Sequence, residues 1–392
     1  MKEQLNKYLK TLVANDGSDL HIKSEAIPRV RIHGILKKLG KEKLDAATVK
    51  TLVREITTAD QYVQLKENKS LDMAYILDEK NRFRVNIFYQ MEGLSIVMRL
   101  IPVEIPTFEE LRLPDIIKSF ADKPRGLVLV TGVTGSGKST TIAAIINRIN
   151  EKYYKHIITL EDPIEFVHRD KKCLINQRAI GQDSNSFKDA LPAALREDPD
   201  IILVGEMRDV ETIDLALHAA NTGHLVFSTL HTLDAKETIN RVIGMFPEEE
   251  QNRIRLSLAS VLAGVISQRL VPTLDGGRIA AIEVMIHTSR IAELITENRD
   301  FEIPDAIAEG RDIYHSQTFD QHLYDLVLGG IISEATALEA SSSPSDLKLR
   351  LEGIGRGTAK DLAKQAEEGS VEQDLDAYDF KEDEEGTELG FS

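Results

Sequence analysis

Eight residues, Gly132–Ser139 (GVTGSGKS), match the phosphate-binding pattern G-x4-G-K-[ST]. Glycines let the backbone curl so that successive N–H groups converge on phosphate oxygens, and the helix that follows adds the positive end of its dipole. A glycine-rich turn can precede a helix by chance. Here an apolar strand pattern (127–130) comes before the loop and a helical pattern (139–149) begins directly after it. The sequence therefore predicts a nucleotide-binding α/β domain.

The residues of this loop have separate expected roles. Lys138 would neutralise charge on the β- and γ-phosphates, and Ser139 would offer its hydroxyl to Mg²⁺. The cofactors predicted from the loop are therefore ATP and Mg²⁺. The predicted nucleotide-binding residues are Gly132, Val133, Thr134, Gly135, Ser136, Gly137, Lys138, Ser139 and Thr140.

P-loop enzymes also need an acidic residue at the end of a neighbouring strand, because Mg²⁺ or the attacking water must be held there. The apolar run Ile201–Val204 is followed by Gly205 and Glu206, and Glu206 would reach Mg²⁺ through water. We interpret Gly205 as leaving room for nucleotide beside Glu206. The alternative is that Ile201–Val204 is a buried strand and that Glu206 is only a solvated residue at its end. The presence of the P-loop in the same chain disfavours this interpretation.

Two further segments place polar residues at strand ends. The acidic box Glu161–Glu165 follows a buried strand pattern and suits metal or water positioning. His224 and His231 bracket another strand pattern, and a γ-phosphate sensor, a subunit contact and a structural role are all open for them. Zinc is disfavoured, because the single cysteine, Cys173, lies elsewhere and two histidines are too few ligands.

Patterning along the chain predicts an antiparallel sheet with helices on one face, then an α/β core with a mostly parallel sheet. Beyond about residue 235 the pattern is mainly helical, with one β insertion near 264–286. The predicted regions are an N-terminal α+β domain (1–100), a proline-containing linker (101–115), an ATPase core (116–290), a C-terminal helical region (291–355) and a disordered acidic tail (356–392).

The net charge of −16 disfavours broad nucleic-acid binding, because a polyanion would be repelled. Residues 367–392 hold eleven acidic residues and one lysine, so this segment carries −10 of that charge. One cysteine allows no intrachain disulfide and favours a reducing compartment. The first ten residues, MKEQLNKYLK, lack a signal-peptide core, and no stretch approaches the roughly 18 apolar residues of a membrane span. We expect a cytoplasmic protein that reaches a membrane only through a partner.

Four segments in a fixed order resemble those of the secretion-system and type IV pilus ATPases. They are the P-loop, the acidic box Glu161–Glu165, the stretch Leu195–Asp209 (LREDPDIILVGEMRD) and the His-containing box Gly223–Thr232. The resemblance extends to residues 17–21 (GSDLH) and 82–86 (RFRVN) and covers roughly residues 1–350.

This resemblance implies a PAS-like N-terminal α+β domain, a RecA-like P-loop ATPase domain and a C-terminal helical region, assembled as a homohexameric ring. It also implies Glu206 as general base, Glu161 as a second catalytic acid near Mg²⁺, and arginines supplied across domain or subunit boundaries. Arg82 and Arg84 alternate with apolar residues, which puts both on one strand face. The remaining candidates for catalytic roles are Arg196, Arg208, Arg269 and His231.

Within the family, the chain is most similar to the pilus retraction ATPases, including their accessory paralogs. It has neither the long N-terminal extension nor the paired C-x-x-C ligands of many assembly and type II secretion ATPases. Residues 290–297 (RIAELITE) keep the apolar frame of a retraction-ATPase helix that reads approximately AIRNLIRE, but not its Arg and Asn positions. Residues 317–323 (QTFDQHL) and 345–349 (SDLKL) resemble the accessory paralog.

The resemblance implies a motor for pilus retraction and twitching motility. It would hydrolyse ATP at the cytoplasmic face of the inner membrane and act on pilin through a platform protein there. An auxiliary subunit beside a paralogous motor, and less favourably an assembly or type II secretion ATPase, are the alternatives. A nucleic-acid motor is disfavoured by the acidic charge and by the absence of Trp, since base-stacking platforms are few.

Overall fold

The computed structural model describes residues 1–32, 34–78, 80–101 and 104–355, and the tail predicted to be disordered (356–392) lies outside the described residues. Six antiparallel strands form the first sheet, in the order β3-β2-β1-β6-β5-β4. These strands are β1 (Gly17–Lys23), β2 (Arg29–Ile32), β3 (Ile35–Lys38), β4 (Ser70–Ile76), β5 (Arg82–Gln90) and β6 (Gly93–Ile101).

Helices cover one face of this sheet. They are α1 (Lys2–Ala14), α2 (Ala46–Ile56) and α3 (Ala59–Asn68). Helix α1 buries Leu5, Leu9 and Leu12, which recur at helical spacing. Strand β5 buries Phe83 and Val85 in the same core, while Arg84 between them faces the other way and is exposed. The predicted antiparallel sheet with helices on one face is confirmed.

The second sheet has seven strands in the order β13-β12-β7-β11-β10-β8-β9. Six of them run parallel and β13 pairs antiparallel with β12 at the edge. The strands are β7 (Gly126–Thr131), β8 (His156–Glu161), β9 (Leu174–Ala179), β10 (Ile201–Val204), β11 (Leu225–Leu230), β12 (Leu262–Pro272) and β13 (Arg278–Ile286). The prediction of a mostly parallel sheet is confirmed.

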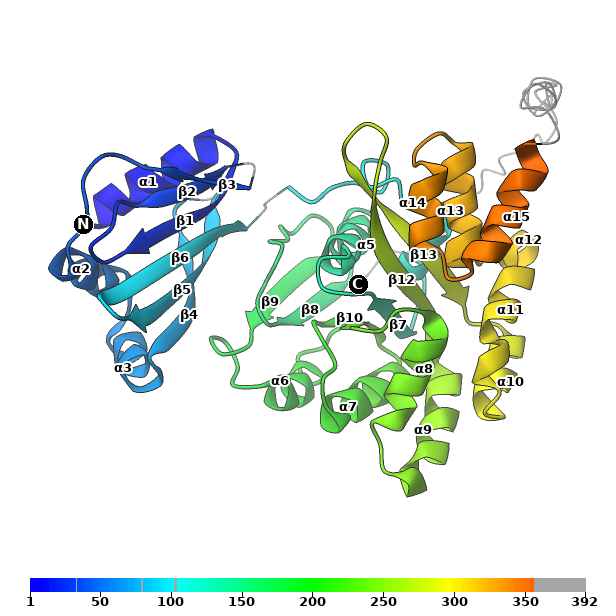
Figure 1. Ribbon diagram of the computed structural model, residues 1–392. Coiled ribbons are helices and arrows are strands. Elements are labelled where there is room, and N and C mark those ends of the chain that lie inside the picture. Colours follow the sequence, from blue (N-terminus) through cyan, green and yellow to red (C-terminus); the bar gives the residue numbers. More distant parts are fainter. Residues whose placement is uncertain (33, 79, 102–103, 356–392) are drawn as a thin grey trace, which may run out of the picture. The chain divides into compact units, whose positions relative to one another are not determined.

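Helices pack on both faces of this sheet, as the continuous apolar strands require (Figure 1). Val128 and Val130 of β7 share a core with Ile145 of α5 on one face. Leu127 and Leu129 share a second core with helices of the other face. The first face carries η1 (Asp115–Ile117), α4 (Lys118–Ala121) and α5 (Lys138–Lys152), and the second carries α6 (Phe187–Ala194), α7 (Val210–Asn221), α8 (Ala235–Gly244) and α9 (Glu248–Val261).

Two expectations for this region were incomplete. The β insertion near 264–286 is not isolated within helices, because β12 pairs with β7 and so extends the central sheet. Strand β9 was not predicted. Its residues 174–179 (LINQRA) alternate too briefly to signal a strand, and the pairing with β8 at the sheet edge defines it.

The C-terminal region is helical, as expected. Its elements are α10 (Ser289–Thr296), η2 (Asp300–Glu302), α11 (Ile303–Glu309), α12 (Arg311–Tyr314), α13 (Phe319–Leu328) and α14 (Glu334–Ala340). Helix α13 lies against β13, where the ring of His322 accepts a hydrogen bond from the Ile282 N–H at 2.9 Å. Helix α15 (Pro344–Gly355) belongs to a second compact unit, which begins at Ser343. Across the described residues, no helix combines the length and the apolar character needed to cross a bilayer.

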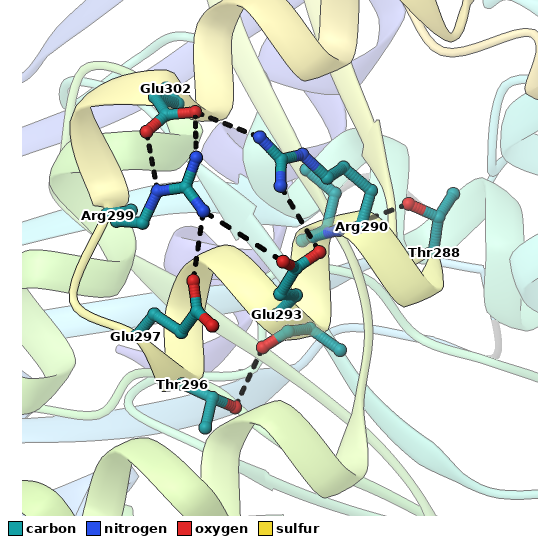
Figure 2. A network of polar contacts seen from close by, with 9 residues as sticks. Thr288, Arg290, Glu293, Thr296, Glu297, Arg299 and Glu302 are labelled. Atoms are coloured by element: carbon teal, nitrogen blue, oxygen red, sulfur yellow. Dashed lines mark hydrogen bonds and ion pairs between the residues drawn. The ribbon is translucent and has the colours of Figure 1, made fainter.

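Helix α10 occupies the segment in which the retraction-ATPase helix motif is altered. Its apolar positions, including Ile291 and Leu294, are buried. The charged residues around it form the network in Figure 2, in which Arg290 contacts Glu293 at 3.2 Å and Glu302 at 2.9 Å. Arg299 contacts Glu302 at 2.6 Å and so ties the same network to η2. Of the altered Arg and Asn positions, Glu293 therefore has a charged partner in this chain, whereas Ala292 has no polar side chain.

Candidate active site

The phosphate loop connects β7 to α5, and its backbone can take this shape only with glycine at its first position. Gly132 has φ +142°, and a Cβ there would lie 2.4 Å from the Gln268 carbonyl oxygen and 2.5 Å from Ser136 Oγ. Ser136 is buried, and its hydroxyl has no hydrogen-bond partner within the described part of the chain. The loop is thus packed against β12 on one side, while Thr134, Gly135 and residues 137–140 line a cavity.

Lys138 is the first residue of α5 and the buried cation of the loop. Its ammonium donates hydrogen bonds to the carbonyl oxygens of Gly132 (2.7 Å) and Val133 (3.1 Å). Burial lowers the pKa of Lys138 below its usual range, and the charges of Glu206 and Glu165 partly oppose this. A positive charge therefore faces two carboxylates across the cavity, which is the charge pattern expected around a bound phosphate and metal.

Parallel pairing of β8 with β10 brings the two predicted acids together. Leu160 pairs with Val204, so Glu161 and Glu206 follow the same row of the sheet at its carboxyl edge. A Cβ on Gly205 would lie 3.1 Å from the Leu160 carbonyl oxygen and 3.3 Å from Glu161 Cα. The close approach of the neighbouring strand end therefore requires glycine at this position. Gly205 also lines the cavity beside Glu206, so its leaving room for nucleotide stays a prediction.

Glu206 is held by two cationic or protonatable side chains. Its Oε2 lies 2.8 Å from Arg208 Nη2, and its Oε1 lies 3.3 Å from His231 Nε2. Burial alone would raise the pKa of Glu206, but the hydrogen bond and charge of Arg208, together with His231, hold that pKa below its usual range. Glu206 is therefore an ionised carboxylate with a fixed orientation near neutral pH.

Glu161 has a different environment. Its Oε1 accepts hydrogen bonds from the Thr159 hydroxyl at 2.6 Å and from the Gln177 amide at 3.1 Å. Burial raises the pKa of the Glu161 carboxyl in spite of these bonds. Gln177 lies on β9, the strand that was not predicted, and it also accepts from the His168 backbone N–H at 2.8 Å. The acidic box is thus held in place by a strand that sequence patterning missed.

A cavity of about 380 Å³ opens over these residues, a size that suits a small ligand. Most of the predicted site converges there, including Lys138, Ser139, Glu161, Glu206 and His231, with Arg208 and Thr140 beside them. Sequence reasoning missed further lining residues. Those on segments without a motif include Phe166, His168, Phe187, Leu270 and Arg278. Thr229 lies within the His-containing box but was not singled out there.

Other predicted residues lie outside this cavity. Arg82 and Arg84 are on β5 of the first sheet, where Arg84 lies 3.8 Å from Asp72. Arg196 is exposed just beyond α6. The guanidinium of Arg269 donates to the Ala340 carbonyl oxygen at 2.6 Å and stacks 3.9 Å from the Phe319 ring centroid, which indicates a packing role in place of the expected catalytic one.

The two histidines of the His-containing box have separate positions. His231 follows β11 and contacts Glu206, whereas His224 precedes the same strand. A ring nitrogen of His224 lies 3.0 Å from the Ala219 carbonyl oxygen, near the end of α7. Because the two ends of one strand lie on opposite edges of the sheet, only His231 can take part in chemistry at the phosphate loop.

The residues present fit a nucleotide with its metal ion. The donor set includes loop backbone N–H groups, the buried Lys138 ammonium, the Ser139 hydroxyl and the carboxylates of Glu161 and Glu206. This combination holds Mg²⁺ and phosphates in P-loop enzymes. The cavity lies at the carboxyl end of the parallel strands, where open α/β sheets bind their ligands. The arrangement can bind a phosphate chain and direct a water toward it.

Comparison with known proteins gives consistent matches. A family model described as "Type II/IV secretion system protein" matches residues 1–278. The type IV pilus retraction ATPase PilT of Pseudomonas aeruginosa is 47% identical over 329 residues, which cover 84% of this chain and 95% of that protein. The type IV pilus ATPase PilU of the same organism is 38% identical over 349 residues, covering 89% and 91%. The crystal structure of the pilus retraction motor PilT with bound ADP superposes with a TM-score of 0.82 at 43% identity, covering 88% of this chain and 98% of that chain.

Proposed function

Because the chain belongs to the type II/IV secretion system protein family, we propose that it is a motor that hydrolyses ATP to retract type IV pili. The chain is a P-loop ATPase that uses adenine nucleotide. The observation that carries the proposal is the likeness to the PilT retraction ATPase over nearly that protein's whole length. The direction of work follows from this likeness, because the same hydrolytic residues would serve assembly or retraction.

Binding of the nucleotide is assigned to the phosphate loop. We propose that loop N–H groups and the Lys138 ammonium hold the phosphates, with the dipole of α5 directed at them. The Ser139 hydroxyl would ligate Mg²⁺, and Glu206 would reach it through water. The metal would supply charge neutralisation at the β- and γ-phosphates.

Hydrolysis is assigned to the two carboxylates. Glu206, ionised and fixed by Arg208 and His231, would take the proton from the attacking water as the water oxygen bonds to the γ-phosphorus. The bond from the γ-phosphorus to the β,γ-bridging oxygen would break in the same reaction, so that ADP leaves with that oxygen. Glu161 would hold water and metal on the opposite side, since its own oxygens are already oriented by Thr159 and Gln177. This division of roles follows from the exposure of Glu206 to the cavity and from the tighter enclosure of Glu161.

Arginines from the first sheet are proposed to complete the site across a domain or subunit boundary, and Arg196 remains a further candidate. Arg84 is exposed, and Arg82 Nε is buried without a hydrogen-bond partner within the described part of the chain. An arginine placed against the transferring phosphoryl group would stabilise charge that develops in the transition state.

Replacing both arginines tests this role. The double variant Arg82→Ala, Arg84→Ala should lose about 10³- to 10⁵-fold in kcat, because arginines contribute that much in related phosphoryl transfers, while ATP affinity changes far less. Steady-state ATPase kinetics and nucleotide titration would measure the two quantities. Arg54→Ala, which removes an arginine from α2 of the same domain, is the matched control and should be near normal. Unchanged kinetics in the double variant would make Arg82 and Arg84 structural residues.

The working assembly is proposed to be a homohexamer at the cytoplasmic face of the inner membrane. Its partner there would be the pilus platform protein, through which domain motions reach the pilin subunits. The absence of a spanning helix among the described residues is consistent with attachment through such a partner. Turnover of the ring against a load would draw pilin out of the fibre.

An auxiliary retraction ATPase, acting with a paralogous motor, is the second candidate. The observation that favours it is the likeness to the PilU pilus ATPase, which also extends over most of both chains. The identity to PilT is higher than the identity to PilU, so we prefer the main motor.

Deleting the gene in its native host tests the direction of work. Cells should keep surface pili but retract them poorly, so twitching on agar falls strongly while pilus counts by electron microscopy stay normal or rise. Wild-type protein should restore twitching, and Lys138→Ala should not. A defect that appears only under load would favour the auxiliary role. Bald cells would contradict retraction and make the protein an assembly motor.

A further inference from the structure

Glu283 is a carboxylate in the interior of strand β13. Only 6% of its surface is exposed, although a carboxylate is among the costliest side chains to bury. Its Oε1 accepts a hydrogen bond of 2.8 Å from the backbone N–H of Ala235, the first residue of α8. A helix N-terminus has unpaired N–H groups and a positive dipole end, so it is a favourable place for a negative charge.

The loop before α8 is bound tightly to that helix. It comprises residues 231–234 and begins with His231. The Thr232 and Thr238 hydroxyls lie 2.6 Å apart, and the Leu233 N–H donates to Glu237 Oε2 at 2.7 Å. Asp234 caps the helix by accepting from the Glu237 N–H at 2.7 Å. The loop and the first turn of α8 therefore form one hydrogen-bonded unit, which we call the His231 unit (residues 231–238).

The His231 unit joins the active site to β13. At one end His231 Nε2 lies 3.3 Å from Glu206 Oε1. At the other end Glu283 holds the Ala235 N–H, and β13 is a strand of the same sheet, paired with β12 along nine residue pairs. An anchor on a rigid strand fixes where the unit lies, and hence where the His231 ring lies relative to Glu206.

We propose that Glu283 is a positioning residue for ATP hydrolysis, which sets the place of His231 against Glu206 by anchoring the start of α8 to β13. The inference rests on the proposed role of Glu206. It does not depend on the direction of pilus movement. Glu283 touches neither nucleotide nor water in this account and acts only through the His231 unit.

The charges around Glu283 suggest that the anchor responds to pH. Asp234 precedes α8, Arg269 lies on β12 and Asp320 lies on α13, and the neutral ring of His322, with a pKa of about 4, faces β13 from the same helix. Burial raises the pKa of Glu283 to about 7, with Asp234 and Asp320 adding to the rise and the Ala235 N–H and Arg269 opposing it. The carboxylate form, which accepts the stronger hydrogen bond, therefore dominates above neutral pH and the acid form below it.

The test compares five variants of the full chain by ATP turnover, nucleotide affinity and melting temperature. Glu283→Ala removes the acceptor, and Glu283→Gln keeps an acceptor of the same shape without the charge. Val284→Ala removes buried methyl groups from the next residue of β13 and controls for lost stability. His231→Ala, alone and combined with Glu283→Ala, forms a double-mutant cycle.

A positioning role gives a specific set of results. Glu283→Ala should lower kcat by on the order of 10- to 100-fold, the scale of small misplacements near the chemistry, with nucleotide affinity within about twofold. In the His231→Ala background, Glu283→Ala should lower kcat little further, because the His231 ring through which Glu283 acts is already absent. Val284→Ala should lower the melting temperature and leave kcat near normal. Additive losses in the cycle, or an equal loss of kcat in Val284→Ala, would overturn the inference.

Glu283→Gln, which keeps the shape of the side chain and removes its charge, supplies the pH readout, and it remains informative if Glu283→Ala folds poorly. At pH 6 the amide resembles the protonated acid, so turnover should match wild type within about twofold. At pH 8 it should be about fivefold slower, because a hydrogen bond to a carboxylate is stronger than one to an amide. A ratio of the two turnover rates that stays constant from pH 6 to pH 8 would contradict the proposal. These assays use purified protein, so they can fail while the pilus retraction phenotype stands.

Discussion

Lys138→Ala should abolish ATP hydrolysis and weaken ATP binding. The ammonium is the buried cation of the phosphate loop and faces Glu206 and Glu165 across the cavity. Without it, two carboxylates would remain beside the phosphates with less positive charge to offset their repulsion. Hydrogen bonds to charged groups contribute about 1.5–3 kcal/mol, so ATP affinity should fall by about 10- to 100-fold. Turnover by phosphate release and affinity by titration with a fluorescent nucleotide would measure both effects.

A second lysine of the same helix provides the control. Lys152 lies at the far end of α5, about 20 Å along the axis at 1.5 Å per residue, and pairs with Asp122 at 2.9 Å. Lys152→Ala removes the same charge without touching the phosphate loop and should keep nearly full turnover. If Lys138→Ala also kept near-normal turnover, the assignment of residues 132–139 as the phosphate loop would be wrong.

Glu206→Gln should keep ATP binding and lose about 10²- to 10⁴-fold in turnover, the usual contribution of general-base catalysis. The amide preserves the shape of the side chain but cannot take a proton from water. The introduced amide would make weaker contacts with Arg208 and His231 but would not collide with them. The fold and the nucleotide cavity should therefore be intact. Single-turnover hydrolysis, measured beside nucleotide affinity, separates the chemical step from binding.

Glu161→Gln is the necessary companion of that variant. The raised pKa of Glu161 makes it a stronger base than Glu206. However, the hydrogen bonds from Thr159 and Gln177 hold the Glu161 carboxylate in one orientation. We expect Glu161→Gln to lower turnover and to raise the Mg²⁺ concentration needed for half-maximal turnover. Persistent turnover in Glu206→Gln, with none in Glu161→Gln, would show that the two acids have the opposite roles.

Much of the ATPase core could be predicted because its information is local. The phosphate loop is one contiguous segment, and the strand before it and the helix after it have the residue periods of their own structures. Strand β9 lacks such a pattern, and its place depends on pairing with β8. For the same reason Gln177, which orients Glu161, could not be recognised from the sequence.

The sequence by itself determined the chemistry that the loop can perform, since Gly132, Lys138 and Ser139 act through their own backbone and side chains within eight residues. Only the tertiary structure decided which distant groups join them. The parallel register of β8 and β10 brings Glu161 and Glu206, which are 45 positions apart in the chain, to the same edge of the sheet. The same register brings the end of β8 so close to Gly205 that a side chain there would be crowded. The contact between His231 and Glu206, the anchor at Glu283 and the packing of Arg269 on Phe319 depend equally on strand order. Register and strand order are set by the burial of whole sheet faces, which no short motif encodes.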